Sequence, residues 1–247
     1  MQHSGLSRRA FIGMLAGGTL AGGALVLGIL RGRERQPAMR TLYTFGDSIL
    51  DCGHYNSAGV HPGQLIVKND DRLFPEFKGM DLLSRGSARL EHRAQDGATV
   101  ESLPRQVRGL TADADGIAII TVGGNDLLRG LITDRGPGID AFAQALDTFI
   151  RGLPIRPVFV GNVYDPSFGD DARNFLNVEP AVSRSSHRRI NAALAEVAQQ
   201  YGALVDLHAH FLQGDPTWLV HTIEPSLRGA SEVRRAFLPH VLDAHSG

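Results

Sequence analysis

The sequence contains the segment Gly116-Ile117-Ala118-Ile119-Ile120-Thr121-Val122-Gly123-Gly124-Asn125-Asp126. Its first part, residues 116–122, is rich in β-branched side chains and has almost no polar atoms. A strand that is apolar on both sides is typical of a parallel sheet covered by helices on both faces. Small and polar residues follow at once, so the strand is expected to end in a polar turn at the edge of such a sheet.

Segments on both sides of residues 116–122 repeat the alternation of short apolar runs with longer stretches of helical period. In residues 139–153 the apolar positions are spaced by three and four, which predicts one buried helical face. This pattern predicts a flavodoxin-like three-layer α/β/α sandwich with a five-stranded parallel sheet. The predicted strands are residues 42–45, 88–94, 116–122, 157–163 and 203–207, and the predicted helices are 100–110, 139–153, 182–201 and 225–242.

The composition excludes several classes of protein. The 247 residues include 25 Lys and Arg against 26 Asp and Glu, for a formal net charge of -1. A chain with this charge balance lacks the basic surface that a nucleic-acid-binding protein needs. The single cysteine, Cys52, excludes an internal disulfide and a multi-cysteine zinc site. A length of this size is enough to bury one sizeable core.

The first 37 residues differ from the rest of the chain. They contain the pair Arg8-Arg9, and an uncharged stretch rich in Gly, Ala and Leu runs through residues 10–30. This arrangement resembles a twin-arginine export signal, which implies contact with the export machinery. The same run is also long enough for a helix that anchors the protein in a membrane. Residues 1–37 are therefore predicted to be an export signal or an anchor that places the protein outside the cytoplasmic membrane, and residues 38–247 a single domain.

Two short motifs follow predicted buried strands. Gly46-Asp47-Ser48 comes after the first strand, and Gly123-Gly124-Asn125-Asp126 comes after the strand at 116–122. Ligands of parallel sheets bind at the carboxyl ends of the strands, so both motifs are expected at one site. A serine hydroxyl becomes a nucleophile when a base takes its proton, and a side-chain amide donates hydrogen bonds without carrying charge.

These motifs, with Gly97 and a final block before the last helix, resemble the SGNH hydrolases, also called the GDSL esterase/lipase family. The resemblance covers residues 40–247. It implies that Ser48 is the nucleophile that forms an acyl-enzyme with a small-molecule carboxylic ester, without a cofactor. It also implies an oxyanion hole made by Ser48, Gly97 and Asn125. Further residues expected to contact the substrate are Asp47, Gly124 and Trp218.

The final block departs from the pattern of that family, which is Asp-x-x-His-Pro. Here the block is His221-Thr222-Ile223-Glu224-Pro225, so the acid and the base have exchanged places. In one interpretation His221 is the base and Glu224 orients its ring, because triads are recognised by geometry and not by chain order. In a second, His210 or His208 is the base and Glu224 supports it. In a third, no competent base exists.

The third interpretation leads to two other functions. One is a protein without catalytic activity that binds esters or glycans on the same fold. The other is a metal-dependent hydrolase: on a strand, alternation would place His208, His210 and Asp206 on one face as ligands. Hydrogen bonds from these histidines to loop backbone are the simpler interpretation of that segment. Trp218 is expected either in a substrate pocket or in an apolar lid over the sheet edge.

Overall fold

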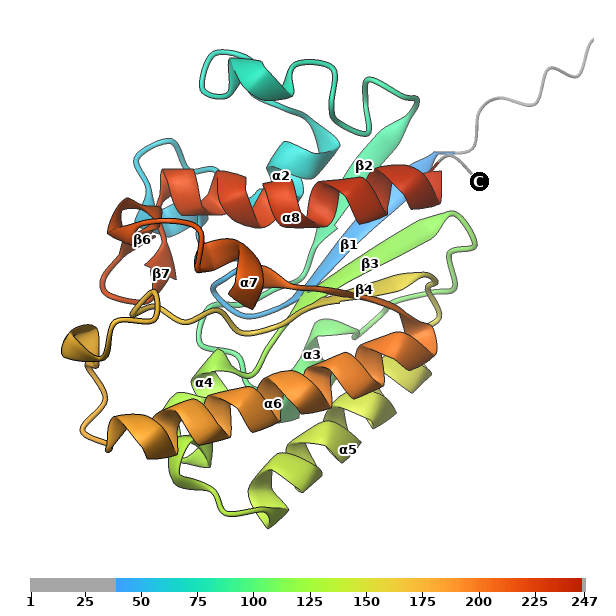
Figure 1. Cartoon of the computed structure of the whole chain (residues 1–247). Coiled ribbons are helices and arrows are strands. Elements are labelled where there is room, and N and C mark those ends of the chain that lie inside the picture. The colour runs from blue at the N-terminus through green and yellow to red at the C-terminus, as the bar shows by residue number, and fades with distance from the viewer. Residues whose placement is uncertain (1–38, 246–247) are drawn as a thin grey trace, which may run out of the picture. The chain divides into compact units, whose positions relative to one another are not determined.

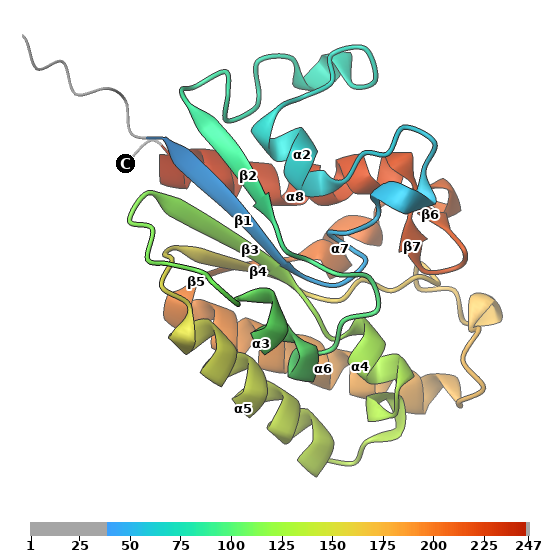
Figure 2. The ribbon, with the colours of Figure 1, turned by 180° about the vertical axis from the view of Figure 1, so that it is seen from behind.

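A computed structural model describes residues 39–245 of the chain. Five parallel strands form one sheet in the order β2-β1-β3-β4-β5, of which Figure 1 labels the first four and Figure 2 labels all five. The predicted flavodoxin-like order and fold class are confirmed. The strands are β1 (Arg40–Gly46), β2 (Ala88–His92), β3 (Gly116–Thr121), β4 (Val158–Gly161) and β5 (Gly202–Val205).

Helices cover both faces of the sheet, and each face has its own hydrophobic core. On one face, α5 (Pro137–Gly152) and α6 (Pro180–Tyr201) pack against alternate residues of β1, β3 and β4. On the other face lie α8 (Leu227–His245), α2 (Pro62–Val67) and α7 (Leu207–Phe211). Figures 1 and 2 show the two helical layers from opposite sides. The central strand β3 is buried along its whole length, as its composition predicts.

Short elements fill the connections between the main layers. They are η1 (Gly53–Tyr55), η2 (Pro75–Phe77), η3 (Val100–Ser102), α3 (Leu103–Gln106), α4 (Gly124–Leu128), η4 (Leu131–Thr133), η5 (Asp171–Arg173), η6 (Pro216–Trp218), β6 (Leu219–Val220) and β7 (Glu224–Pro225).

The predicted bounds of two elements were wrong, and both differences affect the site. The fifth strand ends at Val205, and the next residues form helix α7, whose first turn is capped by the side chain of Asp206. The last helix begins at Leu227 instead of Pro225, because Pro225 pairs with Leu219 in a small antiparallel sheet. A proline can pair at the edge of a two-stranded sheet, since no further strand needs its missing N–H.

A buried arginine holds the long irregular segment 68–85 against α8. The Arg234 guanidinium donates to Asn69 Oδ1 at 2.9 Å and to Ser231 Oγ at 2.6 Å. Its carbon atom Cζ lies 3.4 Å from the centre of the Phe77 ring, a cation–π contact. Burial lowers the pKa of Arg234 to about 10. This segment is therefore tied to the domain and forms part of its wall.

The predicted export signal or anchor at residues 1–37 lies outside the described residues. Among the helices within residues 39–245, none combines the length and the apolar character needed to cross a membrane.

The turn after β1 depends on a glycine that lies directly against β3. Gly46 has φ +118°, and a Cβ atom there would lie 1.7 Å from the Thr121 carbonyl oxygen. The Gln106 side chain bonds both Gly46 backbone groups at 2.8 Å. The next residue, Asp47, donates its N–H to the Thr121 oxygen at 3.1 Å. These contacts fix the direction in which the chain leaves the sheet.

Gly46→Ala should therefore prevent folding or lower the free energy of unfolding by at least about 4 kcal/mol, because the clash is with backbone that cannot move. Gly59→Ala is the matched control: Gly59 also has a positive φ, +65°, but no atom lies within 4 Å of its would-be Cβ. The control should cost about 1 kcal/mol. Urea unfolding of both variants measures the difference, and equal losses would show that the approach to β3 is not limiting.

Candidate active site

Ser48 lies just beyond the carboxyl end of β1, inside the turn that Gly46 begins. Its side chain is buried. Its backbone N–H has no hydrogen-bond partner within the described part of the chain. The structure therefore offers both a hydroxyl and a free backbone donor at this position.

The second backbone donor predicted for an oxyanion hole is on Gly97. Gly97 has φ +73°, and its N–H is also without a partner among residues 39–245. Two side chains fix the backbone around it. Asp51 accepts from the Asp96 N–H at 2.9 Å, and Arg129 donates to the Gly97 carbonyl at 3.0 Å. The loop is thus held with one donor unused.

Asn125, in the first turn of α4, is bonded to that same loop. Its Nδ2 donates to the Ala98 carbonyl at 3.1 Å, which leaves its second amide hydrogen available. The neighbouring Asp126 accepts from the Val100 N–H at 3.2 Å. These two bonds bring the motif after β3 to the glycine loop after β2, as the carboxyl-end rule predicts.

Glu224 is the carboxylate next to Ser48. It belongs to β7 and is 8% exposed. Burial raises the pKa of Glu224, and a hydrogen bond from the Ser48 hydroxyl lowers it by a smaller amount. Its Oε2 atom is buried and has no hydrogen-bond partner among the described residues. Of the groups in the final block, this carboxylate is the one that meets the serine.

His221 lies in a strained part of the same loop. It has φ +49° and Thr222 has φ +74°, values that are uncommon for residues with a side chain. The His221 ring is exposed and lies 5.7 Å from the ring of Tyr55. Within residues 39–245 its side chain makes no hydrogen bond to Ser48 or to Glu224. The first interpretation of the final block requires a hydrogen bond from the His221 ring to Glu224, and this bond is not formed within the described part of the chain.

The other histidine proposed as a base is held elsewhere. His210 Nε2 lies 3.0 Å from Glu232 Oε2, and Glu232 also accepts from Arg235 at 2.9 Å. The His210 ring packs 5.4 Å from the ring of Trp218. Its acidic partner is thus Glu232 in α8, not Glu224 as the second interpretation requires.

The predicted set of metal ligands depended on a strand that the structure replaces with helix α7. The Asp206 carboxylate caps this helix and accepts from Asn162 Nδ2 at 2.8 Å and from the Ala209 N–H at 3.0 Å. His208 packs instead against His187, with ring centres 4.9 Å apart. Across the described residues no group of three His, Cys, Asp or Glu side chains has the arrangement of a metal site. The donor set of the metal-dependent hydrolase is therefore not assembled.

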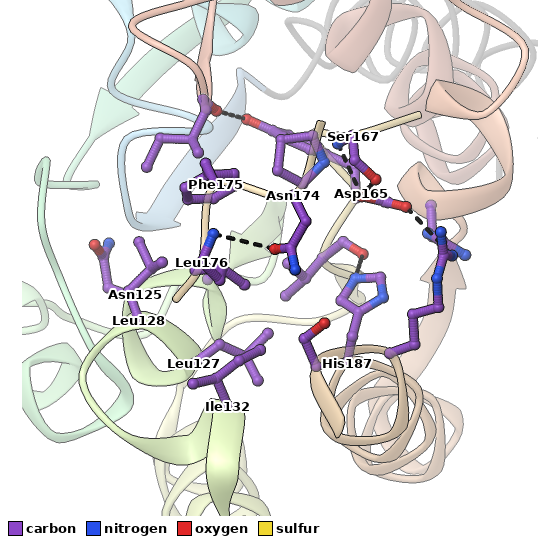
Figure 3. Close-up of a pocket in the computed structure, with 18 of the residues that line it drawn as sticks. Asn125, Leu127, Leu128, Ile132, Asp165, Ser167, Asn174, Phe175, Leu176 and His187 are labelled. Atoms are coloured by element: carbon purple, nitrogen blue, oxygen red, sulfur yellow. Dashed lines mark hydrogen bonds and ion pairs between the residues drawn. The ribbon is translucent and has the colours of Figure 1, made fainter. Parts of the chain in front are cut away.

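A cavity of about 240 Å³ opens beside Ser48. One side of it is apolar, and Figure 3 shows Leu127 and Ile132 on that side, with His187 of α6 on the other. His187 donates from Nε2 to the Val163 carbonyl at 2.8 Å. The lining residues from the predicted set are Asp47, Ser48, Gly124, Asn125 and His208.

Trp218 is absent from that lining. It is buried and packs edge-on against Phe211, with ring centres 5.2 Å apart. Sequence reasoning also missed much of the cavity wall, which comes from the loop after β4 and includes Phe175 and Leu176. The position of that loop after a strand's carboxyl end was the available signal.

Four side chains near Glu224 form a group that we call the polar cluster: His54, Tyr55, Asp96 and His221. The Tyr55 hydroxyl donates to Asp96 Oδ2 at 2.6 Å, and His54 Nε2 lies 3.2 Å from the same oxygen. The charges of His54, Asp96 and His221 all affect the pKa of Glu224. Unlike these residues, the cavity side chains Leu127 and Ile132 are apolar. Ser48 thus has an apolar cavity beside it and polar groups around the neighbouring Glu224.

Asp47 is fully buried beside the serine. Its Oδ1 accepts from Thr121 Oγ1 at 2.8 Å and from the Ile49 N–H at 3.2 Å. Burial raises the pKa of Asp47 to about 7, and the negative charges of Asp126 and Glu224 add to that effect. In mildly acidic solution this carboxyl is therefore protonated and neutral.

Asp47→Asn should change how stability depends on pH. Between pH 4 and 7 the folded protein holds a proton that the unfolded chain releases, so the contribution of Asp47 to the free energy of unfolding falls as pH rises. Across this window the free energy of unfolding of the variant should therefore rise relative to that of the wild type, by on the order of a few kcal/mol. Urea unfolding at several pH values measures this gain. A difference that does not change with pH would contradict the raised pKa of Asp47.

Comparisons with known proteins place this site in a family. The model of the GDSL-like lipase/acylhydrolase family matches residues 44–230. A comparison with curated proteins finds no match. The fold is similar to that of LAE5, an alpha/beta hydrolase from the metagenome of Lake Arreo, at 23% identity and a TM-score of 0.56 over 83% of this chain and 94% of that one. It is also similar to Axe2, an acetylxylan esterase from Geobacillus stearothermophilus, at 18% identity and a TM-score of 0.58 over 82% and 93%. The match to more than half of its length shows that the chain belongs to the GDSL-like lipase/acylhydrolase family.

Proposed function

We propose that the protein is a serine hydrolase that cleaves carboxylic esters through an acyl-enzyme on Ser48. The observation that carries the proposal is the group of unused donors at the serine. The N–H groups of Ser48 and Gly97 have no partner within residues 39–245, and Asn125 has an amide hydrogen to spare. Ser48 is buried, and buried donors are rarely left unpaired unless a ligand or a water uses them.

The chemistry of these groups fits acyl transfer. Ser48 Oγ attacks the ester carbonyl as its proton passes to a base, and negative charge develops on the carbonyl oxygen. Donors at Ser48, Gly97 and Asn125 stabilise that charge, and each fixed donor typically contributes about 10²–10³ to the rate. Collapse releases the alcohol, and water then attacks the acyl-enzyme to release the acid.

The surroundings of Ser48 suggest how an ester would lie. Apolar side chains such as Leu127, Ile132 and Phe175 line the cavity, which suits the acyl chain of a substrate. The polar cluster suits a polar alcohol such as a sugar or glycerol. The substrate class that we propose is therefore an ester of a polar alcohol with an acyl chain longer than acetyl.

A second candidate is a protein that binds such esters without cleaving them. The observation in its favour is that, among the described residues, no imidazole is hydrogen-bonded to Ser48. For the N-terminal region we propose export across the cytoplasmic membrane, with or without anchoring, on the basis of the Arg8-Arg9 pair and the uncharged run of residues 10–30.

Labelling with a fluorophosphonate probe separates the two candidates, because an unactivated serine does not react with it. The wild type should be labelled, and Ser48→Ala should lose both labelling and ester hydrolysis. Ser84→Ala is a control on an exposed serine outside the cavity and should be labelled like the wild type. A folded wild type that is neither labelled nor active would support the binding protein.

The size of the residue at position 132 should set the preference for acyl chain length. Ile132→Trp should lower the ratio of kcat/KM for an octanoate ester to that for an acetate ester by about tenfold or more, since it fills space that the longer chain needs. Ile132→Ala should leave that ratio unchanged or raise it. If both variants keep the wild-type ratio, the acyl chain does not occupy this cavity.

A further inference from the structure

We propose that Glu224 is the base that takes the proton from Ser48, in the place that a histidine holds in the family pattern. This inference rests on the proposed ester hydrolysis and identifies its proton acceptor. The supporting geometry is a buried carboxylate beside the serine: its Oε2 atom has no hydrogen-bond partner among residues 39–245, and the Ser48 hydroxyl lies within reach of the carboxylate. A general base has to be within such reach of the proton that it removes.

The backbone around Glu224 holds the carboxylate in place. Glu224 pairs with Val220 across the two-stranded sheet, and the following Ser226 donates its N–H to the Trp218 carbonyl at 2.9 Å. On the other side, the Tyr164 hydroxyl donates to the carbonyl of Ile223. Residues before and after Glu224 are thus both fixed, so its side chain reaches Ser48 from a rigid support.

The imidazoles near the site have other partners or none. His54 is paired with Asp96, His210 with Glu232, and His187 with the Val163 carbonyl. The exposed His221 makes no hydrogen bond among residues 39–245, and its ring lies beside Tyr55. None of these rings is hydrogen-bonded to the serine in the described part of the chain.

The surroundings of Glu224 favour a stronger base than an ordinary carboxylate. Burial raises its pKa, and the negative charge of Asp96 acts in the same direction. The positive charges of His54 and His221 act against it when these rings are protonated. The titratable groups that interact electrostatically with Glu224 are Asp47, Cys52, His54, Tyr55, Asp96, Tyr164 and His221.

The proton balance of the reaction closes with Glu224 alone. Ser48 loses its proton to the carboxylate as Oγ bonds to the ester carbon, and the resulting carboxylic acid gives that proton to the departing alkoxide. In the second half, Glu224 takes a proton from water as the water oxygen attacks the acyl-enzyme, and returns it to Ser48 Oγ as that bond breaks.

A glutamate base predicts a distinctive pH dependence. The activity requires the ionised carboxylate, so kcat/KM should rise through the pKa of Glu224. Because burial raises the pKa of Glu224, this rise should lie above the ordinary range of a glutamate, near 4.3. An imidazole base would place the same rise near pH 6 to 7.

The test is the profile of kcat/KM against pH from 3.5 to 8.5, with released acid from a short-chain ester measured by chromatography. The wild type should show a rise that moves in Glu224→His and stays in place in His221→Gln. In Glu224→Gln the plateau value of kcat/KM should fall by about 10³-fold or more and approach that of Ser48→Ala. Glu196→Gln, a glutamate on α6, is the matched control and should keep the wild-type profile.

Two further variants keep the inference falsifiable if Glu224→Gln is unstable. Glu224→His should retain activity with its rise moved toward the range of histidine, and His221→Gln should lose less than tenfold and keep the wild-type rise. The inference is overturned if the wild-type rise lies near pH 6.5 and disappears in His221→Gln. It is also overturned if folded Glu224→Gln stays active while Ser48→Ala is inactive, a result that would leave the proposed esterase intact. Failure of the esterase itself would appear as a wild type without activity or probe labelling at any pH.

Discussion

The contact between the Gly46 backbone and β3 is the constraint on which the site depends. The chain passes so close to Thr121 that no side chain fits, and Gln106 bonds both backbone groups of the glycine. This approach sets the direction of the turn, and the turn sets where Ser48 points. Asp51, three residues beyond Ser48, then fixes the loop that presents Gly97. The proposed nucleophile and oxyanion donor are thus positioned by one short segment after the first strand.

The second feature of the site is the amount of negative charge gathered near Ser48. Glu224 interacts with both Asp47 and Asp96, and the carboxyls of Asp47 and Glu224 are buried. Because burial raises the pKa of Asp47 to about 7, that group is neutral in mild acid and adds no negative charge beside the serine. Such surroundings suit the proposed carboxylate base, because burial raises the pKa of Glu224 and so makes it a stronger base.

The sequence predicted the layers of the fold well, because β3 and the helix around residues 139–153 have strong periodic patterns. The residues after β1 and β3 were predicted to share a site, and they line one cavity, since parallel strands bring their carboxyl ends together. The role of His210 could not be predicted, because its pairing with Glu232 depends on how α7 and α8 pack. Trp218 entered the core for a similar reason: its place depends on Phe211, which the sequence alone does not position.

The most direct test of Ser48 as the nucleophile is the mass of the protein stopped by acid during turnover of an ester. An acyl-enzyme predicts an added mass equal to the acyl group less one hydrogen, located by fragmentation on the peptide that carries Ser48. The same adduct should be absent from Ser48→Ala. Turnover without any covalent adduct under rapid mixing, or an adduct on another residue, would contradict the assignment.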